Sequence, residues 1–377
     1  MKINFKKKDE IQQKGTKTQQ LEVNFGPHHP STHGVFCMVL RLDGENVVGV
    51  DPKVGFLHRG IEKLAESRTY PQCIPFTDRL DYISSMTNNL AYVQTVEKLM
   101  KVEVPQRAEY IRVIIAELQR IVNHVIFWGT FGNDLGASTA LMYAFREREK
   151  ILNIFEKLTG SRMTYSYMRI GGVAKNLSDE LLIEIEDCID NFPEALKEYH
   201  GLVTGNEIFQ ARSKGVGVLT AEEAIDYGIS GPNLRASGVD YDLRKDEPYG
   251  VYDKFDFNVP VRQNGDVLDR YLVRMQEMEE SCQIIKQALA KLPDGDIKAK
   301  APKKAPEGTV YHHIEAPKGD LGFYLVSDGS KKPYRFRIRP ASFINLMALE
   351  EMMIGEKVAD AIAILGSIDI VLGEVDR

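Results

Sequence analysis

Three residues of this chain are of types that can hold or donate protons: His33 in PSTHG, Tyr82 in RLDY and Asp134 in DLGA. An imidazole titrates near neutral pH, and a phenol O–H donates a hydrogen bond to a carbonyl oxygen. A carboxylate beside an imidazole raises the imidazole pKa and favours its charged form. The residue types alone leave ordinary alternatives open, because His33 suits a solvated loop, Tyr82 a core position and Asp134 a helix cap.

The cysteines do not form a metal-binding pattern. Cys37, Cys73, Cys188 and Cys282 are far apart, and no two have C-x-x-C spacing. A self-sufficient zinc or iron–sulfur site needs closely spaced thiolates, so we expect no metal bound by this chain. Scattered cysteines without a disulfide framework fit a reducing compartment.

Composition and charge narrow the function classes. The chain has 377 residues, of which 43% are hydrophobic and 27% charged, as in ordinary globular proteins. Its net charge of -6 provides no basic field for nucleic acid. No run of eighteen apolar residues is present, so we expect any membrane association to go through partners.

The first twenty residues form a separate segment. They carry six Lys, no Arg and no apolar core typical of a signal peptide. We interpret residues 1–20 as a disordered basic arm. Because a mitochondrial leader would be rich in Arg, we expect a prokaryotic-type membrane system.

The hydrophobic pattern predicts β-strands near both chain ends and helices between them. An Asp-Gly pair at 43–44 predicts a hairpin turn. The predicted strands are 20–25, 35–42, 47–51, 310–315, 321–327 and 334–339. The predicted helices are 88–101, 107–128, 141–158, 178–200, 267–292, 343–350 and 357–365. Residues 201–262 are expected to be loop-rich, and 293–308 to form an exposed Lys/Pro loop. The fold class is therefore α+β, with a central helical bundle and small β-sheets at the N- and C-terminal ends.

Eight motifs, in this order, resemble the quinone-site subunit family of respiratory complex I (NADH:quinone oxidoreductase), the D type or 49 kDa type. They are GPHHPSTHG at 26–34, GFLHRGIEK at 55–63, RTYPQCIPFTDRLDY at 68–82, DLGAST at 134–139, RIGGV at 169–173, LRASGVDYDLRK at 234–245, EAPKGDLGFYLVSDG at 315–329 and GEVDR at 373–377. The resemblance covers nearly the whole chain after residue 20. It implies a single domain over 21–377, similar to the large subunit of [NiFe] hydrogenases.

The same resemblance implies that the hydrogenase metal has been lost. Asp81, Ser84, Val371 and Glu374 stand where hydrogenase large subunits carry their four cysteines. We expect a cluster of ionisable residues there in place of the metal, and buried charges need partners. Its expected members are Asp81, Asp369, Glu374, Asp376 and Arg377, with Arg79, Arg335, Arg337 or Arg339 as ion-pair partners.

The resemblance assigns roles in quinone reduction to the three residues named first. It implies that His33 and Tyr82 hold the quinone carbonyl oxygens and donate protons, and that Asp134 pairs with His33 and re-supplies its proton. Phe36 and Met38 are candidate lining residues of a long apolar cavity. The remaining histidines of the two N-terminal motifs, His28, His29 and His58, are expected to serve loop structure.

Partners follow from the same family. The electron donor is expected to be a [4Fe-4S] cluster on a subunit of the B type, with Arg59 and Arg79 close to it. NADH and FMN are expected on further partner subunits. Subunits of the C, I and H types are expected neighbours, the last admitting menaquinone or ubiquinone from the membrane. The expected location is the cytoplasmic face of the inner cell membrane, as a peripheral protein.

One departure from the family pattern bears on the quinone. Where many members have RMHAAYIR, this chain has RMTYSYMR at 162–169, so Thr164 replaces a histidine. We hypothesise a weaker pH dependence of the cluster potential and a low-potential acceptor such as menaquinone. A redox titration showing a strong slope with pH would count against this hypothesis.

Alternatives from other classes remain. A nickel-dependent hydrogenase is excluded by the four missing cysteines. A catalytically silent scaffold of the same fold is disfavoured by His33, Tyr82 and Asp134 remaining in frame. The same subunit in a complex fed by ferredoxin or another donor stays open, because the donor module lies on other chains.

Overall fold

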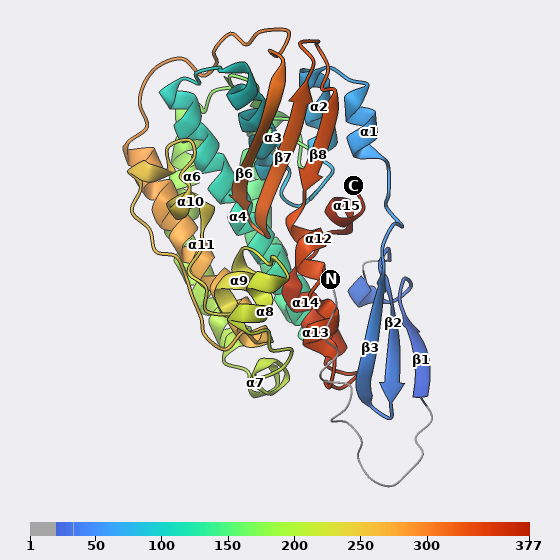
Figure 1. The fold of residues 1–377 in the computed structure, drawn as a ribbon. Helices are drawn as coiled ribbons and strands as arrows, with labels where there is room; N and C mark the ends of the chain where they lie inside the picture. The colour runs from blue at the N-terminus through green and yellow to red at the C-terminus, as the bar shows by residue number, and fades with distance from the viewer. Residues whose placement is uncertain (1–19, 33) are drawn as a thin grey trace.

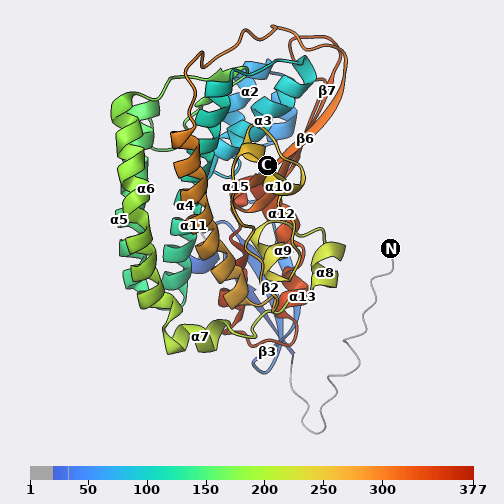
Figure 2. The same cartoon turned by 90° about the vertical axis from the view of Figure 1, so that its left-hand side faces the viewer.

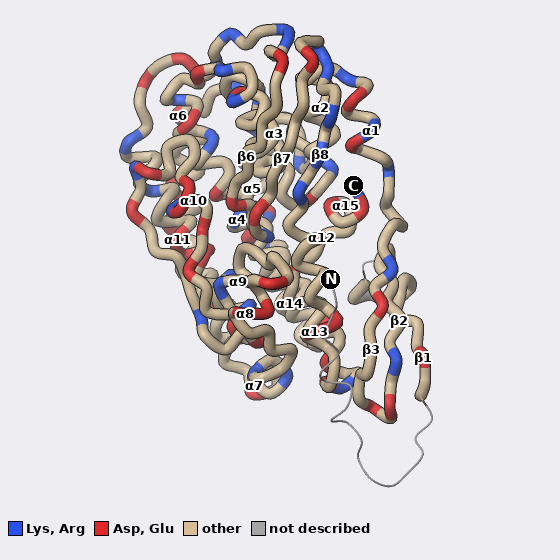
Figure 3. Tube along the Cα trace, in the orientation of Figure 1, with Lys and Arg blue, Asp and Glu red and all other residues tan. Residues whose placement is uncertain are grey.

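The structure is a computed structural model that describes residues 20–32 and 34–377. The basic arm predicted for residues 1–20 lies outside these residues except for Gln20, and His33 also lies outside them. The described residues share one continuous hydrophobic core. Acidic and basic residues are interspersed along the chain (Figure 3).

The N-terminal end forms a three-stranded antiparallel sheet (Figure 1). Its strands are β1 (Gln20–Phe25), β2 (Cys37–Asp43) and β3 (Asn46–Lys53), as the alternating pattern predicted. Met38, Leu40 and Leu42 alternate on the buried face of β2. The start of β3 is tied to the segment between α13 and α14, because Val47 N–H donates to Glu356 O at 2.8 Å and Gly355 N–H to Val47 O at 2.8 Å.

The helical body confirms the predicted long helices. They are α3 (Ser85–Met100), α4 (Gln106–Asp134), α5 (Ser138–Thr159), α6 (Asp179–Tyr199) and α11 (Val267–Ala290). In Figure 2, α5 and α6 form an outer layer beside α4 and α11. No helix of the described residues is long and apolar enough to cross a membrane.

Helix α4 is buried on nearly all sides, and its interior positions include charged residues. Glu117 lies 3.1 Å from Arg120 Nε and 3.2 Å from Arg244 Nη1. Burial alone would raise the pKa of Glu117, but Arg120 and Arg244 outweigh it and lower that pKa to about 2. The helix therefore carries paired charges into the core and acts as the central support of the fold.

The C-terminal end forms a second antiparallel sheet against α3. Its strands are β6 (Gly308–Ala316), β7 (Gly319–Ser327) and β8 (Arg335–Arg339), confirming the three predicted strands. Tyr92 of α3 packs against Phe323 and Phe336, with ring centroids 5.6 Å apart in both pairs. Four short helices follow: α12 (Ala341–Leu346), α13 (Leu349–Met353), α14 (Ala361–Ile368) and α15 (Leu372–Val375).

Several short elements escaped prediction. They are α1 (Ile61–Glu66), α2 (Tyr70–Thr77), α15, and the small helices of the loop-rich region, α7 (Glu207–Ser213), α8 (Ala221–Asp226), α9 (Pro232–Ala236) and α10 (Leu243–Asp246). Each spans only one or two turns, too short to show a 3.6-residue period. Helix α2 also contains Pro71 and Pro75, and only its Thr69–Gln72 capping box marks its start.

The Lys/Pro segment 293–308 is mostly exposed, but its middle is tied to the body. A two-residue ladder joins β4 (Met168–Arg169) to β5 (Gly172–Val173). Ala299 N–H donates to Gly171 O at 2.8 Å, and Val173 N–H donates to Ile297 O at 3.1 Å. The segment thus adds an edge to this ladder.

This edge predicts a difference between two glycine variants. Gly172 has φ +154°, and a Cβ there would lie 2.0 Å from Ile297 O, whereas Gly295 has φ +139° and no described atom within 4 Å. Both Gly172→Ala and Gly295→Ala strain the backbone, so their difference isolates the contact with Ile297. We expect Gly172→Ala to lower the free energy of unfolding by about 1–3 kcal/mol more than Gly295→Ala. Urea unfolding measures this, and equal losses would contradict the described edge.

Candidate functional site

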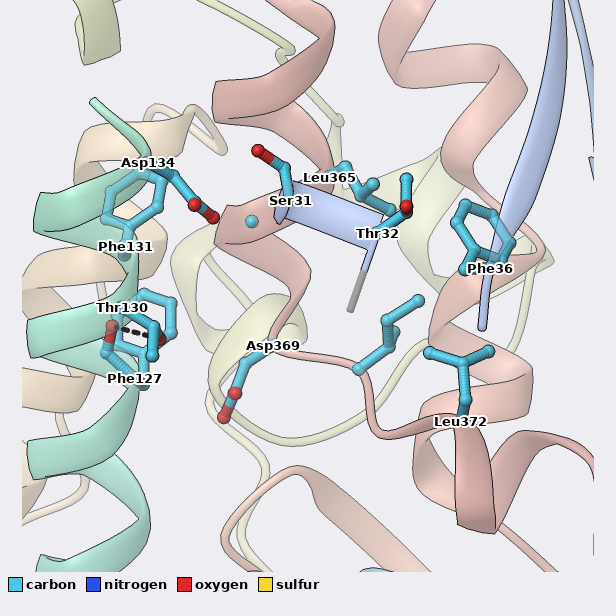
Figure 4. Close-up of a pocket in the computed structure, with 12 residues that line it drawn as sticks. Ser31, Thr32, Phe36, Phe127, Thr130, Phe131, Asp134, Leu365, Asp369 and Leu372 are labelled. Atoms are coloured by element: carbon cyan, nitrogen blue, oxygen red, sulfur yellow. Dashed lines mark hydrogen bonds between the residues drawn. The ribbon is translucent and has the colours of Figure 1, made fainter. Parts of the chain in front are cut away.

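A small cavity lies where the N-terminal hairpin meets α4 and α14 (Figure 4). Its volume is about 30 Å³, room for about one water molecule. Three parts of the chain build it: the 3₁₀ turn Pro30–Thr32 with Phe36, the last two turns of α4, and the stretch from the end of α14 to the start of α15. The lining residues are Ser31, Thr32, Phe36, Phe127, Thr130, Phe131, Asp134, Leu365, Gly366, Asp369, Ile370 and Leu372.

The hairpin side of the cavity is held by side-chain and backbone hydrogen bonds of Thr32. Its hydroxyl donates to His29 O at 2.7 Å, and its carbonyl accepts from Phe36 N–H at 3.1 Å. Phe36 lines the cavity, whereas Met38 is fully buried and is not among the lining residues. His33 follows Thr32 in the sequence but lies outside the described residues, so its placement stays a prediction.

Asp134 is the last residue of α4, and it lines the cavity. Its carboxylate points from α4 toward Ser31 (Figure 4). The capping alternative fails on geometry, because the residue at the N-cap of α5 is Ala137. Asp134 and the turn that precedes His33 therefore share one cavity.

Tyr82 lies against α15. Leu372 lines the cavity, while a Cβ on the next residue, Gly373, would lie 3.1 Å from Tyr82 Cδ1. Tyr82 is half-buried in the turn before α3. Burial, followed by the neighbouring Asp81, raises the pKa of Tyr82, so its phenol keeps its proton to higher pH than usual. The structure does not place Tyr82 among the residues that line the cavity of Asp134.

The buried side chain of Lys318 pairs with two carboxylates, one beside Tyr82 and one in the cavity wall. Lys318 Nζ lies 3.0 Å from Asp81 Oδ2 and 3.6 Å from Asp369 Oδ2, and it donates a short hydrogen bond to Asn123 Oδ1. Burial opposes the ammonium form, but Asp369 and Asp81 outweigh it and raise the pKa of Lys318. Asn123 Nδ2 also donates to Asp369 Oδ2 at 3.0 Å. The sequence interpretation missed both Lys318 and Asn123.

The predicted arginine partners of this cluster are wrong. Arg335 pairs with Glu66 at 3.1 Å, Arg337 with Glu62 at 3.0 Å and Arg339 with Asp320 at 3.2 Å. The reason is strand alternation: in β8 the arginines occupy one face while Phe336 and Ile338 fill the buried face.

Only part of the predicted carboxylate set converges. Asp376 turns away and accepts from the backbone N–H groups of Gly55 and Leu57, both at 2.7 Å. Arg377 pairs with Glu62 at 3.3 Å. Of the predicted members, Asp81, Asp369 and Glu374 surround Lys318.

Arg59 and Arg79 are exposed neighbours. Arg59 Nη2 donates to Arg79 O at 2.7 Å, and Arg79 Nη1 donates to Pro75 O at 2.5 Å. Burial, followed by the charge of Arg79, lowers the pKa of Arg59. Among the described residues neither guanidinium forms an ion pair, which leaves two adjacent cations on one surface.

The remaining predicted residues have local partners. His58 Nδ1 lies 2.7 Å from Asp376 O, and His29 Nδ1 accepts from Ser31 N–H at 3.2 Å, both consistent with loop roles. Thr164 is half-buried with a left-handed φ of +53°. The cysteines Cys37, Cys73, Cys188 and Cys282 are free thiols.

Glu374 predicts a pH dependence of stability. Its carboxylate is fully buried and accepts from Ala341 N–H at 2.9 Å and Ser342 N–H at 3.2 Å. Burial, followed by Asp81, raises the pKa of Glu374 above its ordinary 4.5, so the folded chain keeps this proton where the unfolded chain has lost it. Its contribution is complete below pH 4.5 and is lost as the pH rises through the raised pKa.

The test compares Glu374→Gln with the wild-type chain. We expect the contribution of Glu374, measured as the difference in free energy of unfolding between the wild-type chain and Glu374→Gln, to decline as the pH rises above 4.5, because Gln has no carboxyl to ionise. Urea titrations across this range measure both. Glu222→Gln, on the surface helix α8, should keep the wild-type pH dependence. Identical pH profiles for Glu374→Gln and the wild-type chain would show that Glu374 does not titrate in this way.

Comparison with known proteins places the chain in a family. Residues 134–306 and 300–377 match the family described as "Respiratory-chain NADH dehydrogenase, 49 Kd subunit". A protein of Clostridium beijerinckii, named as the D-type subunit of NADH-quinone oxidoreductase, is 55% identical over 362 residues, covering 96% of this chain and 98% of that protein. One of Desulforamulus reducens with the same name is 57% identical over 362 residues, covering 96% and 99%. The chain belongs to the family of the 49 kDa subunit of respiratory-chain NADH dehydrogenase.

Proposed function

We propose that this chain forms the quinone headgroup site of a proton-pumping NADH:quinone oxidoreductase and supplies protons for quinone reduction. The observation that carries the proposal is the shared cavity of Asp134 and the Ser31–Thr32 turn, with Tyr82 against Gly373, the neighbour of the cavity residue Leu372. The relatives are named as subunits of NADH-quinone oxidoreductase, and that name supplies the substrate class.

The reaction adds two electrons and two protons to the quinone to give the quinol. Tyr82 donates its phenol hydrogen bond to one carbonyl oxygen, and His33 to the other. Because burial raises the pKa of Tyr82, its proton stays on the phenol until a quinone oxygen has gained negative charge. Asp134 pairs with His33 and returns a proton to it after transfer.

The headgroup needs more room than the cavity of this chain alone provides, since about 30 Å³ holds about one water molecule. The exposed side chains Val54 and Phe56, at 45% and 57% exposure, precede Arg59 in the same loop. We propose that subunits of the B and H types cover this loop and complete the site, the second admitting the quinone tail. Subunits of the C and I types complete the peripheral arm on the cytoplasmic face of the inner membrane.

Electrons reach the quinone from outside this chain. A [4Fe-4S] cluster on the B-type subunit supplies them when that subunit is bound, after NADH and FMN on further subunits. The adjacent guanidiniums of Arg59 and Arg79 support this proposal. Both are exposed cations that form no ion pair among the described residues, and such cations stabilise a nearby anionic cluster. Thr164, which cannot titrate, supports the proposal that the acceptor is a low-potential quinone such as menaquinone.

The experiment is quinone reduction by membranes that carry Tyr82→Phe or Asp134→Asn in the assembled complex. We expect a loss of about 100-fold in kcat for each variant, the usual contribution of a placed proton donor. Reduction of an artificial acceptor that takes electrons upstream should persist. Tyr241→Phe is the matched control, because burial also raises the pKa of this half-buried tyrosine, which is not among the cavity residues.

Unchanged quinone reduction in both variants would make Tyr82 and Asp134 packing residues and would contradict the proposal. Equal loss of quinone and artificial-acceptor reduction would instead mean that the substitutions damage assembly.

A further inference from the structure

Lys318 reaches the protein interior on the tip of a β-hairpin. Ala316 and Gly319 are paired, so only Pro317 and Lys318 form the β6–β7 turn. The tip is clamped on both sides: Asn345 Nδ2 donates to Lys318 O at 2.9 Å, and Asp320 N–H donates to Ser230 Oγ at 3.0 Å. A Cβ on Gly319, whose φ is +128°, would lie 2.5 Å from Ser230 Oγ. Lys318 therefore has a fixed backbone.

The ammonium of this fixed residue joins two parts of the proposed site. Asp81, 3.0 Å away, immediately precedes Tyr82 in the chain. Asp369, 3.6 Å away, lines the cavity that contains Asp134. The Asp81 turn is short and internally bonded, since Ile83 N–H donates to Asp81 Oδ1 at 3.1 Å. The Asp81 carboxylate is therefore bonded both to Lys318 and to the turn that carries Tyr82.

The side chains around the Lys318 ammonium restrict its position. Asn123 Oδ1 accepts from Lys318 and also from Ser84 Oγ, the latter at 3.0 Å. Arg274 Nε lies 4.0 Å from Asp369, so Asp369 has a second cation nearby. For Asp81, Lys318 is the ion-pair partner among the described residues. Loss of Lys318 would leave a buried carboxylate next to Tyr82 without its cation.

We propose that Lys318 is a positioning residue for quinone reduction, whose buried ammonium fixes Asp81, and with it Tyr82, relative to the Asp369 wall of the cavity. This inference rests on the proposed function, because it gives Lys318 its effect through the proton donor Tyr82. A role in charge balance alone is different. It would require only that the charges of Lys318 and Asp81 cancel, and it would not require a bond between them.

A double-mutant cycle in the assembled complex tests the inference. Lys318→Met should lower the kcat for quinone reduction by about 10-fold in the wild-type background and by less than about 2-fold in the Tyr82→Phe background. Upstream reduction of an artificial acceptor should be unchanged. Lys318→Arg, which keeps a cation, should recover most of the loss. Lys286→Met, which removes a partly exposed ion pair with Asp190 at 2.7 Å, is the control and should leave both activities unchanged.

Charge balance is separated from positioning by Lys318→Met combined with Asp81→Asn, which removes both charges. Recovery of quinone reduction in this variant would overturn the positioning role. Persistence of the loss supports it, because the bond between Lys318 and the Asp81 side chain is then still absent. If Lys318→Met does not assemble, Lys318→Gln replaces it in the cycle under the same criteria.

The two proposals fail differently. Equal losses from Lys318→Met in the wild-type and Tyr82→Phe backgrounds, with Tyr82→Phe itself strongly impaired, would overturn the role of Lys318 and leave the proposed function standing. An unimpaired Tyr82→Phe would remove the proton donor from the proposed function and the inference with it.

Discussion

The ion cluster around Lys318 joins four segments that are far apart in the sequence. Asp81 precedes α3, Asn123 lies on α4, Lys318 lies at the β6–β7 turn and Asp369 follows α14. A buried ion pair is costly to desolvate, and it persists only where several partners satisfy each charged group. Lys318 meets this condition with two carboxylates and one amide oxygen. The turn of Tyr82 and the wall of the cavity therefore depend on the same contacts.

The rest of the fold supports these contacts from two directions. Helix α4 runs through the core, where its buried charged residues form ion pairs, and it ends at Asp134. The cavity is therefore built on a rigid element. Helix α14 lies directly against it, because a Cβ on Gly366 would lie 2.9 Å from Phe131 Cδ2. The third wall is the short turn before β2, whose sheet is tied to the chain near Gly355 and Glu356. Two rigid walls and one short turn suit a site that positions proton donors.

Regular elements were predictable from the sequence because periodicity reports them. The strands at both ends and the five long helices follow from alternation and from three-to-four spacing. The site residues were not predictable in this way. Asp134 and Tyr82 were identified by resemblance to a family, because no periodic pattern marks them. Lys318 was missed because a Pro-Lys-Gly turn between strands is typical of an exposed hairpin tip. The sequence itself contradicts Arg335 and Arg337 as partners of the buried carboxylates. The alternation in RFRIR places both on the face opposite Phe336.

The proposed site places a quinone headgroup between the hairpin turn, the end of α4 and Tyr82. The most direct measurement is labelling of the assembled complex in its membrane with a quinone that carries a photoreactive group on the ring, followed by mass spectrometry of this chain's peptides. We expect labels within residues 31–36, 82 or 127–134, and their loss when excess unmodified quinone competes. Competed labels confined to other parts of this chain, or to other subunits, would contradict the claim.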